Sequence, residues 1–245
     1  MKQLFQAILA NIGYKLVPLR HPTRQAFEDQ KALVRGKSVM IFDVGAHHGE
    51  TSLLYNNLFK EPLIYAFEPF IASFEQLKNN TSGINNIKIF NIAIGNTSGE
   101  VDFHVNSSAP TNSILATHPQ SHINWGPGLL NTLETTRINS LTLDDFIEQN
   151  KIGKINILKL DTQGAEYSII EGALNSIAQN KISLIYLEII IMPTYVGQKY
   201  LDEILFLLRQ TGFVLYNFYN YQFTASGELL QVDAIFRYNG AEQLR

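Results

Sequence analysis

Short apolar segments that lead into an acidic residue recur along this chain and constrain its fold more than any other feature. The segments and their acids are 38–42 with Asp43, 63–67 with Glu68, 155–160 with Asp161, and 183–187 with Glu188. Continuous apolar runs of this length are typical of strands that are buried on both faces of a parallel sheet. The carboxyl ends of such strands meet at one edge, where α/β proteins bind their ligands. We therefore expect the four acids to gather at that edge.

Segments with apolar residues at helical spacing alternate with these strands and predict an α/β fold with helices on both faces of the sheet. The expected helices span 51–59, 69–79, 143–149 (capped by Thr142), 164–178 and 200–210. Residues 87–92 form a third strand, 101–105 an added antiparallel strand, and 213–218 with 232–236 an antiparallel pair at one edge of a mostly parallel sheet. Residues 106–136 are rich in Ser, Asn, Thr, Pro and Gly, and a loop of this length usually carries function or is mobile.

The first 36 residues predict a helical cap or lid ahead of a main domain over 37–245. Gly13, Pro18 and Pro22 interrupt this segment. Its start is amphipathic and favours a helix over a signal peptide, because no small-residue cleavage site follows. The residues on the apolar face are Leu4, Phe5, Ile8, Leu9 and Ile12.

Composition excludes several classes of protein. The chain has no cysteine, so disulfides, thiolate nucleophiles and Cys-ligated zinc are ruled out. Its net charge is −3 and it has no basic run, which argues against nucleic acid as a partner. It has no apolar stretch of about 18 residues, the length of a transmembrane helix. We expect a cytoplasmic enzyme without a membrane span, and leave open a homo-oligomer.

The turn after the first expected strand, residues 43–49, points to one cofactor. Gly45 and Gly49 allow close approach of the backbone to a ligand, but the G-x-G-x-x-G spacing that clamps a pyrophosphate is missing. Asp43 suits a cationic amino group. Glu68 follows Gly49 by 19 positions, where a carboxylate accepts hydrogen bonds from ribose hydroxyls. A ribose with an ammonium group and no pyrophosphate indicates S-adenosylmethionine (SAM), although NAD also has a ribose.

Five segments together resemble a known family. The segments FDVGAHHGE, YAFEP, NIAIGN, TLDDF and ILKLDTQGAEYSIIEGA, in this order, are similar to those of the FkbM family of SAM-dependent methyltransferases. The similarity spans about residues 39–188, and the K-x-D-x-x-G-x-E block that starts at Lys159 is its most specific part. It implies a Rossmann-like class I methyltransferase fold and O-methylation of a hydroxyl on a sugar or natural product.

The resemblance also implies roles for individual residues. Asp43, Gly45 and the His47 backbone, in the turn that contains Gly49, would hold the methionine part of SAM, Glu68 the ribose, Asn91 and Ala93 the adenine, and Asp161 would lie near the methyl group. His47 departs from the Asn that the family commonly has there. Both residues tolerate a positive φ, so His47 is either a backbone choice or an added titratable group.

Each assignment has a structural alternative. Asp43 could cap the next helix, Glu68 could be a surface acid, and Asp161 could pair with Lys159. Glu166 is as consistent with compensating a helix dipole as with a site role, and Glu188 is left open. Trp125, Tyr195 and Tyr219 either line an acceptor pocket or belong to the core.

For the chemistry, Asp161 is the first candidate for a general base, followed by His47 or His48. The two histidines are expected to point apart, and their spacing does not indicate a metal site. The alternatives to a methyltransferase are an NAD-dependent oxidoreductase or epimerase and a non-catalytic binding module with the same fold.

Overall fold

The computed structural model describes residues 22–34, 36 and 38–240. The amphipathic helix expected near residues 4–12 lies outside the described residues. None of the described helices is long and apolar enough to cross a membrane.

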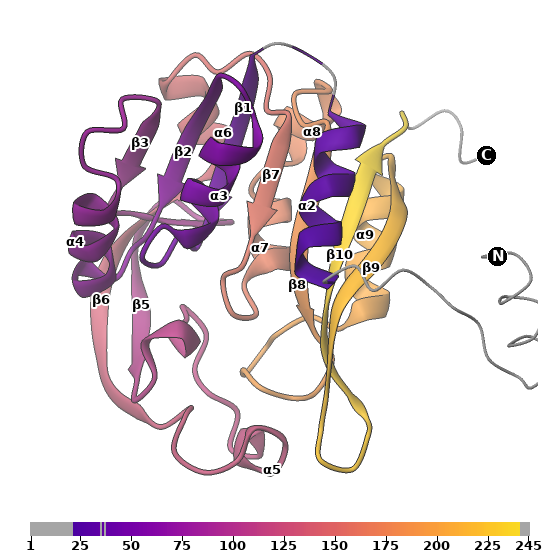
Figure 1. Ribbon diagram of the computed structural model, residues 1–245. Coiled ribbons are helices and arrows are strands. Elements are labelled where there is room, and N and C mark those ends of the chain that lie inside the picture. Colours follow the sequence, from indigo (N-terminus) through magenta and orange to yellow (C-terminus); the bar gives the residue numbers. More distant parts are fainter. Residues whose placement is uncertain (1–21, 35, 37, 241–245) are drawn as a thin grey trace, which may run out of the picture.

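A seven-stranded sheet forms the centre of the protein (Figure 1). Its strands are β1 (Val39–Val44), β2 (Pro62–Phe67), β3 (Ile87–Phe90), β7 (Ile157–Leu160), β8 (Leu184–Ile190), β9 (Phe213–Phe223) and β10 (Leu229–Tyr238), in the order β3-β2-β1-β7-β8-β10-β9. The strands from β3 to β8 in this order run parallel, and β10 is antiparallel to both of its neighbours. The expected mostly parallel, Rossmann-like sheet with an antiparallel edge is confirmed.

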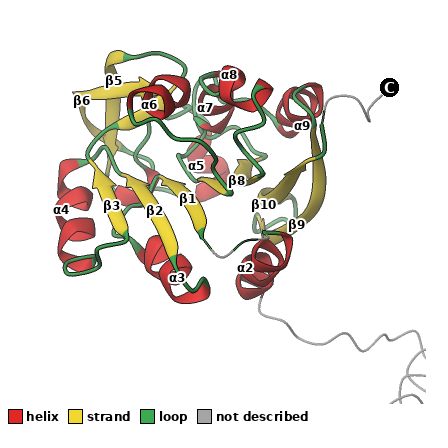
Figure 2. Ribbon diagram, turned by 90° about the horizontal axis from the view of Figure 1, so that it is seen from above, coloured by secondary structure: helices red, strands yellow, loops and turns green. Residues whose placement is uncertain are grey.

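Helices cover both faces of this sheet (Figure 2). On one face lie α2 (Pro22–Leu33), α3 (Glu50–Leu58) and α4 (Ile71–Asn80); on the other lie α6 (Leu143–Gln149), α7 (Glu166–Glu171), α8 (Leu174–Ala178) and α9 (Leu201–Gln210). Successive side chains of a strand point to opposite faces of the sheet, so each strand contributes to the hydrophobic core on both faces. In β1, Ile41 packs toward α3, whereas Phe42 packs toward α6. Thr142 caps α6 as expected, because its hydroxyl accepts a hydrogen bond from the Asp145 backbone N–H.

A second, three-stranded sheet is inserted between β3 and β7. It contains β4 (Ala93–Gly95), β5 (Gly99–Asn106) and β6 (Thr132–Thr142), in the order β4-β6-β5, and the antiparallel pairing of β5 confirms the added strand. The short helices η1 (Ala109–Thr111) and α5 (Ser121–Trp125) follow β5. In Figure 1 the parallel strands point down, and this insertion lies below their carboxyl ends.

Three expectations for elements were wrong. The loop over 106–136 contains η1, α5 and the start of β6. The helix over 164–178 is split into α7 and α8 at Gly172, where a Cβ would lie 2.1 Å from the Gly95 carbonyl oxygen, so this close approach to β4 requires glycine. The strand that was expected to end before Glu188 continues to Ile190, so Glu188 lies within β8.

The described part of the expected cap, α2, packs into the core of its face. The Phe27 ring meets Tyr55 and Tyr186 edge to face, with centroids 5.2 and 5.7 Å apart. The Tyr55 hydroxyl donates a hydrogen bond to Gln30 Oε1 at 2.7 Å. The division of the chain at residue 36 stays a prediction.

Candidate active site

A cavity of about 350 Å³ lies at the carboxyl edge of the main sheet. It lies beyond the ends of the paired strands β1 and β7, because the chain after β1 leads to α3 on one face of the sheet and the chain after β7 leads to α7 on the other. Such a switch point is where open α/β sheets bind ligands. The walls include residues 44–47, 67–69, 92–94, 112–114 and 161–163, with Lys159 and Glu188.

The turn after β1 is shaped by backbone conformations that few side chains tolerate. Gly45 has a φ of 76°, and a Cβ there would lie 1.9 Å from the Asp161 carbonyl oxygen. His47 has a φ of 49°, which confirms the expected positive φ at this position. Gly49 lies away from the cavity, and a Cβ there would meet a Leu77 methyl group at 2.7 Å. Gly45 therefore shapes the cavity wall, whereas Gly49 allows α3 to start close to α4.

Glu68 presents a nearly buried carboxylate to the cavity. Its Oε2 accepts a hydrogen bond from the His47 backbone N–H and its Oε1 from the Phe70 backbone N–H, each at 2.9 Å. Burial raises the pKa of Glu68 to about 7, against the opposing effect of these hydrogen bonds and of Lys159. Two fixed backbone donors leave further lone pairs on both oxygens, so this carboxylate is oriented to accept hydrogen bonds from a diol.

Of the two residues expected near the adenine, Ala93 and Asn91, only Ala93 lines the cavity. Ala93 lines the cavity between Ile92 and Ile94. The Asn91 side chain instead donates to the carbonyl oxygens of Glu68 and Pro69, both at 2.9 Å. Asn91 thus holds the chain after β2, behind the cavity wall.

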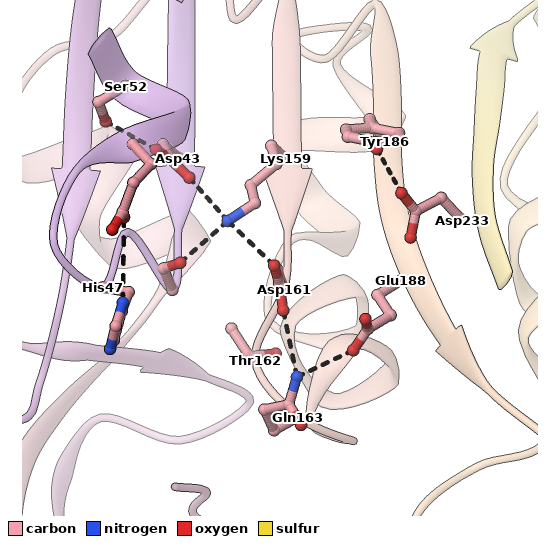
Figure 3. Close-up of polar contacts among 12 residues, drawn as sticks. Asp43, His47, Ser52, Lys159, Asp161, Thr162, Gln163, Tyr186, Glu188 and Asp233 are labelled. Atoms are coloured by element: carbon pink, nitrogen blue, oxygen red, sulfur yellow. Dashed lines mark hydrogen bonds and ion pairs between the residues drawn. The ribbon is translucent and has the colours of Figure 1, made fainter. Parts of the chain in front are cut away.

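Asp43 is fully buried and its carboxylate is occupied by protein groups (Figure 3). Its Oδ2 accepts a hydrogen bond from the Ser52 hydroxyl at 2.6 Å, and its Oδ1 lies 2.9 Å from the ammonium of Lys159. Asp43 and Lys159 are register partners in β1 and β7. Both carboxylate oxygens are engaged, so Asp43 acts on the cavity through the neighbours that it holds.

Lys159 is a buried cation that joins the two halves of the site. Its ammonium donates to the Gly45 carbonyl oxygen at 2.9 Å and lies 3.6 Å from Asp161 Oδ2. Burial acts to lower the pKa of Lys159, but the carboxylates of Asp43, Asp161 and Glu188 hold it above its usual value. The alternative pairing of Asp161 with Lys159 is thus observed. The sequence did contain a sign that Lys159 has several partners. Lys159 is the one charged residue in the apolar segment INILKL, and a buried charge requires partners.

Beyond β7, two carboxylates share one amide. Gln163 Nε2 donates to Asp161 Oδ1 at 3.3 Å and to Glu188 Oε2 at 2.9 Å, as Figure 3 shows. Gln231 Nε2 donates to the other oxygen, Glu188 Oε1, at 2.6 Å. Glu188, although inside β8, still faces the cavity. Neither glutamine was singled out from the sequence, because amide side chains carry no spacing pattern.

Glu166 holds the turn that carries these groups. It is buried, and its Oε1 accepts hydrogen bonds from the Thr162 backbone N–H at 2.7 Å and from the Thr162 hydroxyl at 3.0 Å. Burial raises its pKa. The carboxylate is thus directed to the turn before α7 rather than to the cavity.

The expectation that His47 and His48 point apart was wrong: their rings stack, with centroids 3.6 Å apart and planes 24° apart. Their Nδ1 atoms lie 3.9 and 3.7 Å from the Glu50 carboxylate. Lone pairs lie in the ring planes, and two nearly parallel planes do not converge on one ion at the roughly 2 Å bond length of a metal–imidazole contact. Only His47 lines the cavity, and burial followed by the nearby His48 lowers its pKa.

Three aromatic residues left open by the sequence are structural. The Tyr195 hydroxyl lies 2.8 Å from the Thr111 carbonyl oxygen and 3.1 Å from Gln163 Oε1. Trp125 Nε1 donates to the Thr194 hydroxyl at 2.7 Å, and the Tyr219 hydroxyl donates to Asp29 at 2.8 Å. None of the three lines the cavity, although Tyr195 supports its wall.

Comparison with known proteins identifies the family. Residues 43–215, which include both halves of the site, match the methyltransferase FkbM domain. The chain belongs to the FkbM family of methyltransferases. It is therefore a SAM-dependent methyltransferase, as the resemblance of its motifs implied.

Two kinds of relative support this assignment. The 2-O-methyltransferase NoeI of Sinorhizobium fredii is 26% identical over 194 residues, which cover 72% of this chain and 74% of NoeI. An rRNA methylase from Streptococcus thermophilus has a TM-score of 0.50 at 11% identity and covers 91% of this chain and 99% of its own. A putative rRNA methylase from Clostridium thermocellum has the same TM-score at 9% identity, with coverages of 90% and 99%. At these identities the two structures show the fold alone.

The residues of the FkbM cavity fit SAM. Glu68 offers a backbone-oriented carboxylate for the ribose, and the glycine at position 45 brings the turn against the Asp161 backbone. The turn offers no pyrophosphate cradle, and SAM has no pyrophosphate.

Proposed function

We propose that this FkbM-family enzyme transfers a methyl group from SAM to a hydroxyl of a saccharide or a similar polyhydroxylated small molecule. The observation that carries this proposal is one cavity that Glu68, Asp161 and Glu188 all line. Several carboxylates in the walls of one cavity suit hydroxyl groups, which donate hydrogen bonds to them. The relationship to a 2-O-methyltransferase supports the same class of acceptor.

The binding roles follow from the walls of the cavity. Glu68 accepts hydrogen bonds from the ribose hydroxyls, and the backbone of Gly45 and His47 holds the methionine part. Ala93 and its apolar neighbours contact the adenine. Asp43 contributes by fixing Lys159, which in turn holds the Gly45 carbonyl group. Gly49 and Asn91 support the turns around these residues.

The reaction needs an aligned acceptor and a base. Bound SAM supplies a methyl group activated by its sulfonium centre. The protein positions the acceptor hydroxyl in line with that group, which can lower the barrier by roughly 7–11 kcal/mol. Asp161 and His47 face the cavity and are the candidates for the base that the sequence predicts; the His48 ring lies behind His47.

Other readings have less support. The missing G-x-G-x-x-G and the family membership favour methyl transfer over NAD chemistry. The net charge of −3 favours a small-molecule acceptor over nucleic acid. A cytoplasmic location and a homo-oligomer stay predictions.

The test measures cofactor binding and methyl transfer separately. Isothermal titration with S-adenosylhomocysteine (SAH) is expected to show one site per chain. Incubation with methyl-labelled SAM and a panel of methyl glycosides is expected to give a labelled glycoside ether. SAH binding without labelling of any glycoside would contradict the saccharide acceptor.

A further inference from the structure

Glu188 differs from the other carboxylates of the cavity in the groups that hold it. Its two oxygens accept hydrogen bonds from Gln163 at 2.9 Å and from Gln231 at 2.6 Å, both of which are neutral amides. It lines the cavity from the middle of β8, on the side of β7 that faces away from Glu68 and β2. Each oxygen keeps a further lone pair for a ligand, and the two donors carry no opposite charge.

The other candidates for a base are paired with a cation or lie on the side of Glu68. Asp161 Oδ2 lies 3.6 Å from the ammonium of Lys159. His47 belongs to the β1 turn, on the same side as Glu68, and its backbone N–H is bonded to that carboxylate. The site therefore divides into a cofactor side, formed by the turns after β1 and β2, and an acceptor side, formed by Gln163 and Glu188.

We propose that Glu188 is the residue that binds and deprotonates the acceptor hydroxyl; this rests on the proposed function. The acceptor O–H bond breaks and its proton passes to the Glu188 carboxylate. The acceptor oxygen forms a bond to the methyl carbon as the carbon–sulfur bond breaks, and that electron pair remains on sulfur. The products are the methyl ether, SAH and one proton, which Glu188 releases to solvent.

The surroundings of Glu188 fix its orientation. Gln163 Oε1 lies 3.1 Å from the Tyr195 hydroxyl, which directs the Gln163 amide group toward the two carboxylates. The Ser113 hydroxyl donates to the Gln163 carbonyl oxygen at 2.8 Å and thereby ties the inserted segment to the same turn. Gln163 and Tyr195 are positioning residues, because they act through Glu188.

The charges around Glu188 suit a base. Burial, followed by the carboxylates of Asp161, Asp233 and Glu166, raises its pKa well above the usual value, and Lys159 opposes this. A carboxylate with a raised pKa takes up a proton more readily than an exposed glutamate does, as a base requires.

The kinetic test compares the Glu188→Gln variant with the wild-type enzyme, using the methyl glycoside that the wild-type enzyme methylates best. We expect Glu188→Gln to lower kcat by roughly 10²–10⁴-fold and to abolish the acidic limb of the kcat–pH profile. Its Kd for SAH should stay within about twofold, which shows that the variant is folded and binds the cofactor product. A kcat within about threefold of wild type, or an unchanged acidic limb, would overturn the assignment of Glu188.

A binding test needs no acceptor. Sinefungin carries an ammonium group where SAM carries its methyl, so a carboxylate that faces the acceptor position favours sinefungin over SAH. We expect Glu188→Gln to reduce the ratio of the two affinities by roughly tenfold or more, as for loss of one charged hydrogen bond. An unchanged ratio would overturn the proposal for Glu188. A wild-type enzyme that binds SAH but methylates no glycoside would instead contradict the saccharide acceptor.

Discussion

The two sides of the cavity hold their carboxylates by different means. On the cofactor side, Glu68 accepts hydrogen bonds from two backbone N–H groups. On the acceptor side, Glu188 accepts them from the side chains of Gln163 and Gln231. Backbone donors come with the turns of the fold, whereas amide donors depend on the residues chosen. We infer that the first arrangement serves the cofactor and the second the acceptor.

Lys159 links the two sides, and its removal should have the largest effect. Lys159→Met leaves Asp43 buried beside an apolar side chain, so we expect the free energy of unfolding to fall by about 3–5 kcal/mol. Urea denaturation measures this change. The double variant Lys159→Met with Asp43→Asn removes both charges and should recover part of the loss. A single variant with a wild-type midpoint would show that the ion pair does not join the two sides.

Among the acids on the cofactor side, only Glu68 should contribute directly to the affinity for SAH. Glu68→Gln replaces a charged acceptor of the ribose hydrogen bonds, and we expect SAH to bind roughly 10–100-fold more weakly. The matched control on the acceptor side, Gln163→Ala, should leave the Kd for SAH within about twofold. Equal losses in the two variants, measured by calorimetry, would remove the distinction between the sides.

The titration of Glu68 gives a pH dependence of binding. Its pKa in the folded protein is raised from 4.5 to about 7, so its contribution to the stability of the ligand-free protein is fully present below about pH 4.5 and is lost as the pH rises through 7. SAH binding has the opposite sign, because ribose hydroxyls donate to the ionised carboxylate. The affinity should fall by about tenfold from pH 8 to pH 6. The Glu68→Gln variant should show a flat profile; a similar slope in that variant would assign the titration to another group.

The positive φ of His47 predicts the smallest effect. A β-branched residue is strained at a φ of 49°, so His47→Val should lower the free energy of unfolding by about 1–2 kcal/mol. His47→Asn tolerates this conformation and should stay within about 0.5 kcal/mol of wild type. Thermal denaturation distinguishes the two. Equal losses in both variants would assign the cost to the lost imidazole rather than to the backbone.

Features set by local sequence could be predicted, whereas contacts between residues far apart in the chain could not. The sheet and the cavity-facing positions of Glu68 and Asp161 follow from apolar runs, spacing and glycine turns, which act locally. The positive φ of His47 was expected only from the family resemblance. The engagement of Asp43 with Lys159 does not follow from such local features, because it depends on the register of β1 against β7, strands more than a hundred residues apart. The roles of Gln163 and Gln231 escape prediction for the same reason. The stacking of His47 on His48 follows from the left-handed backbone at His47, which breaks the usual alternation of neighbouring side chains.

A crystal structure of the SAH complex tests most directly the claim that the cavity has a cofactor side at Glu68 and an acceptor side at Glu188. We expect both ribose hydroxyls to lie within hydrogen-bonding distance of the Glu68 carboxylate. The sulfur should face the space in front of Asp161 and Glu188. A ribose bound elsewhere, or a sulfur turned away from Glu188, would contradict the division of the cavity.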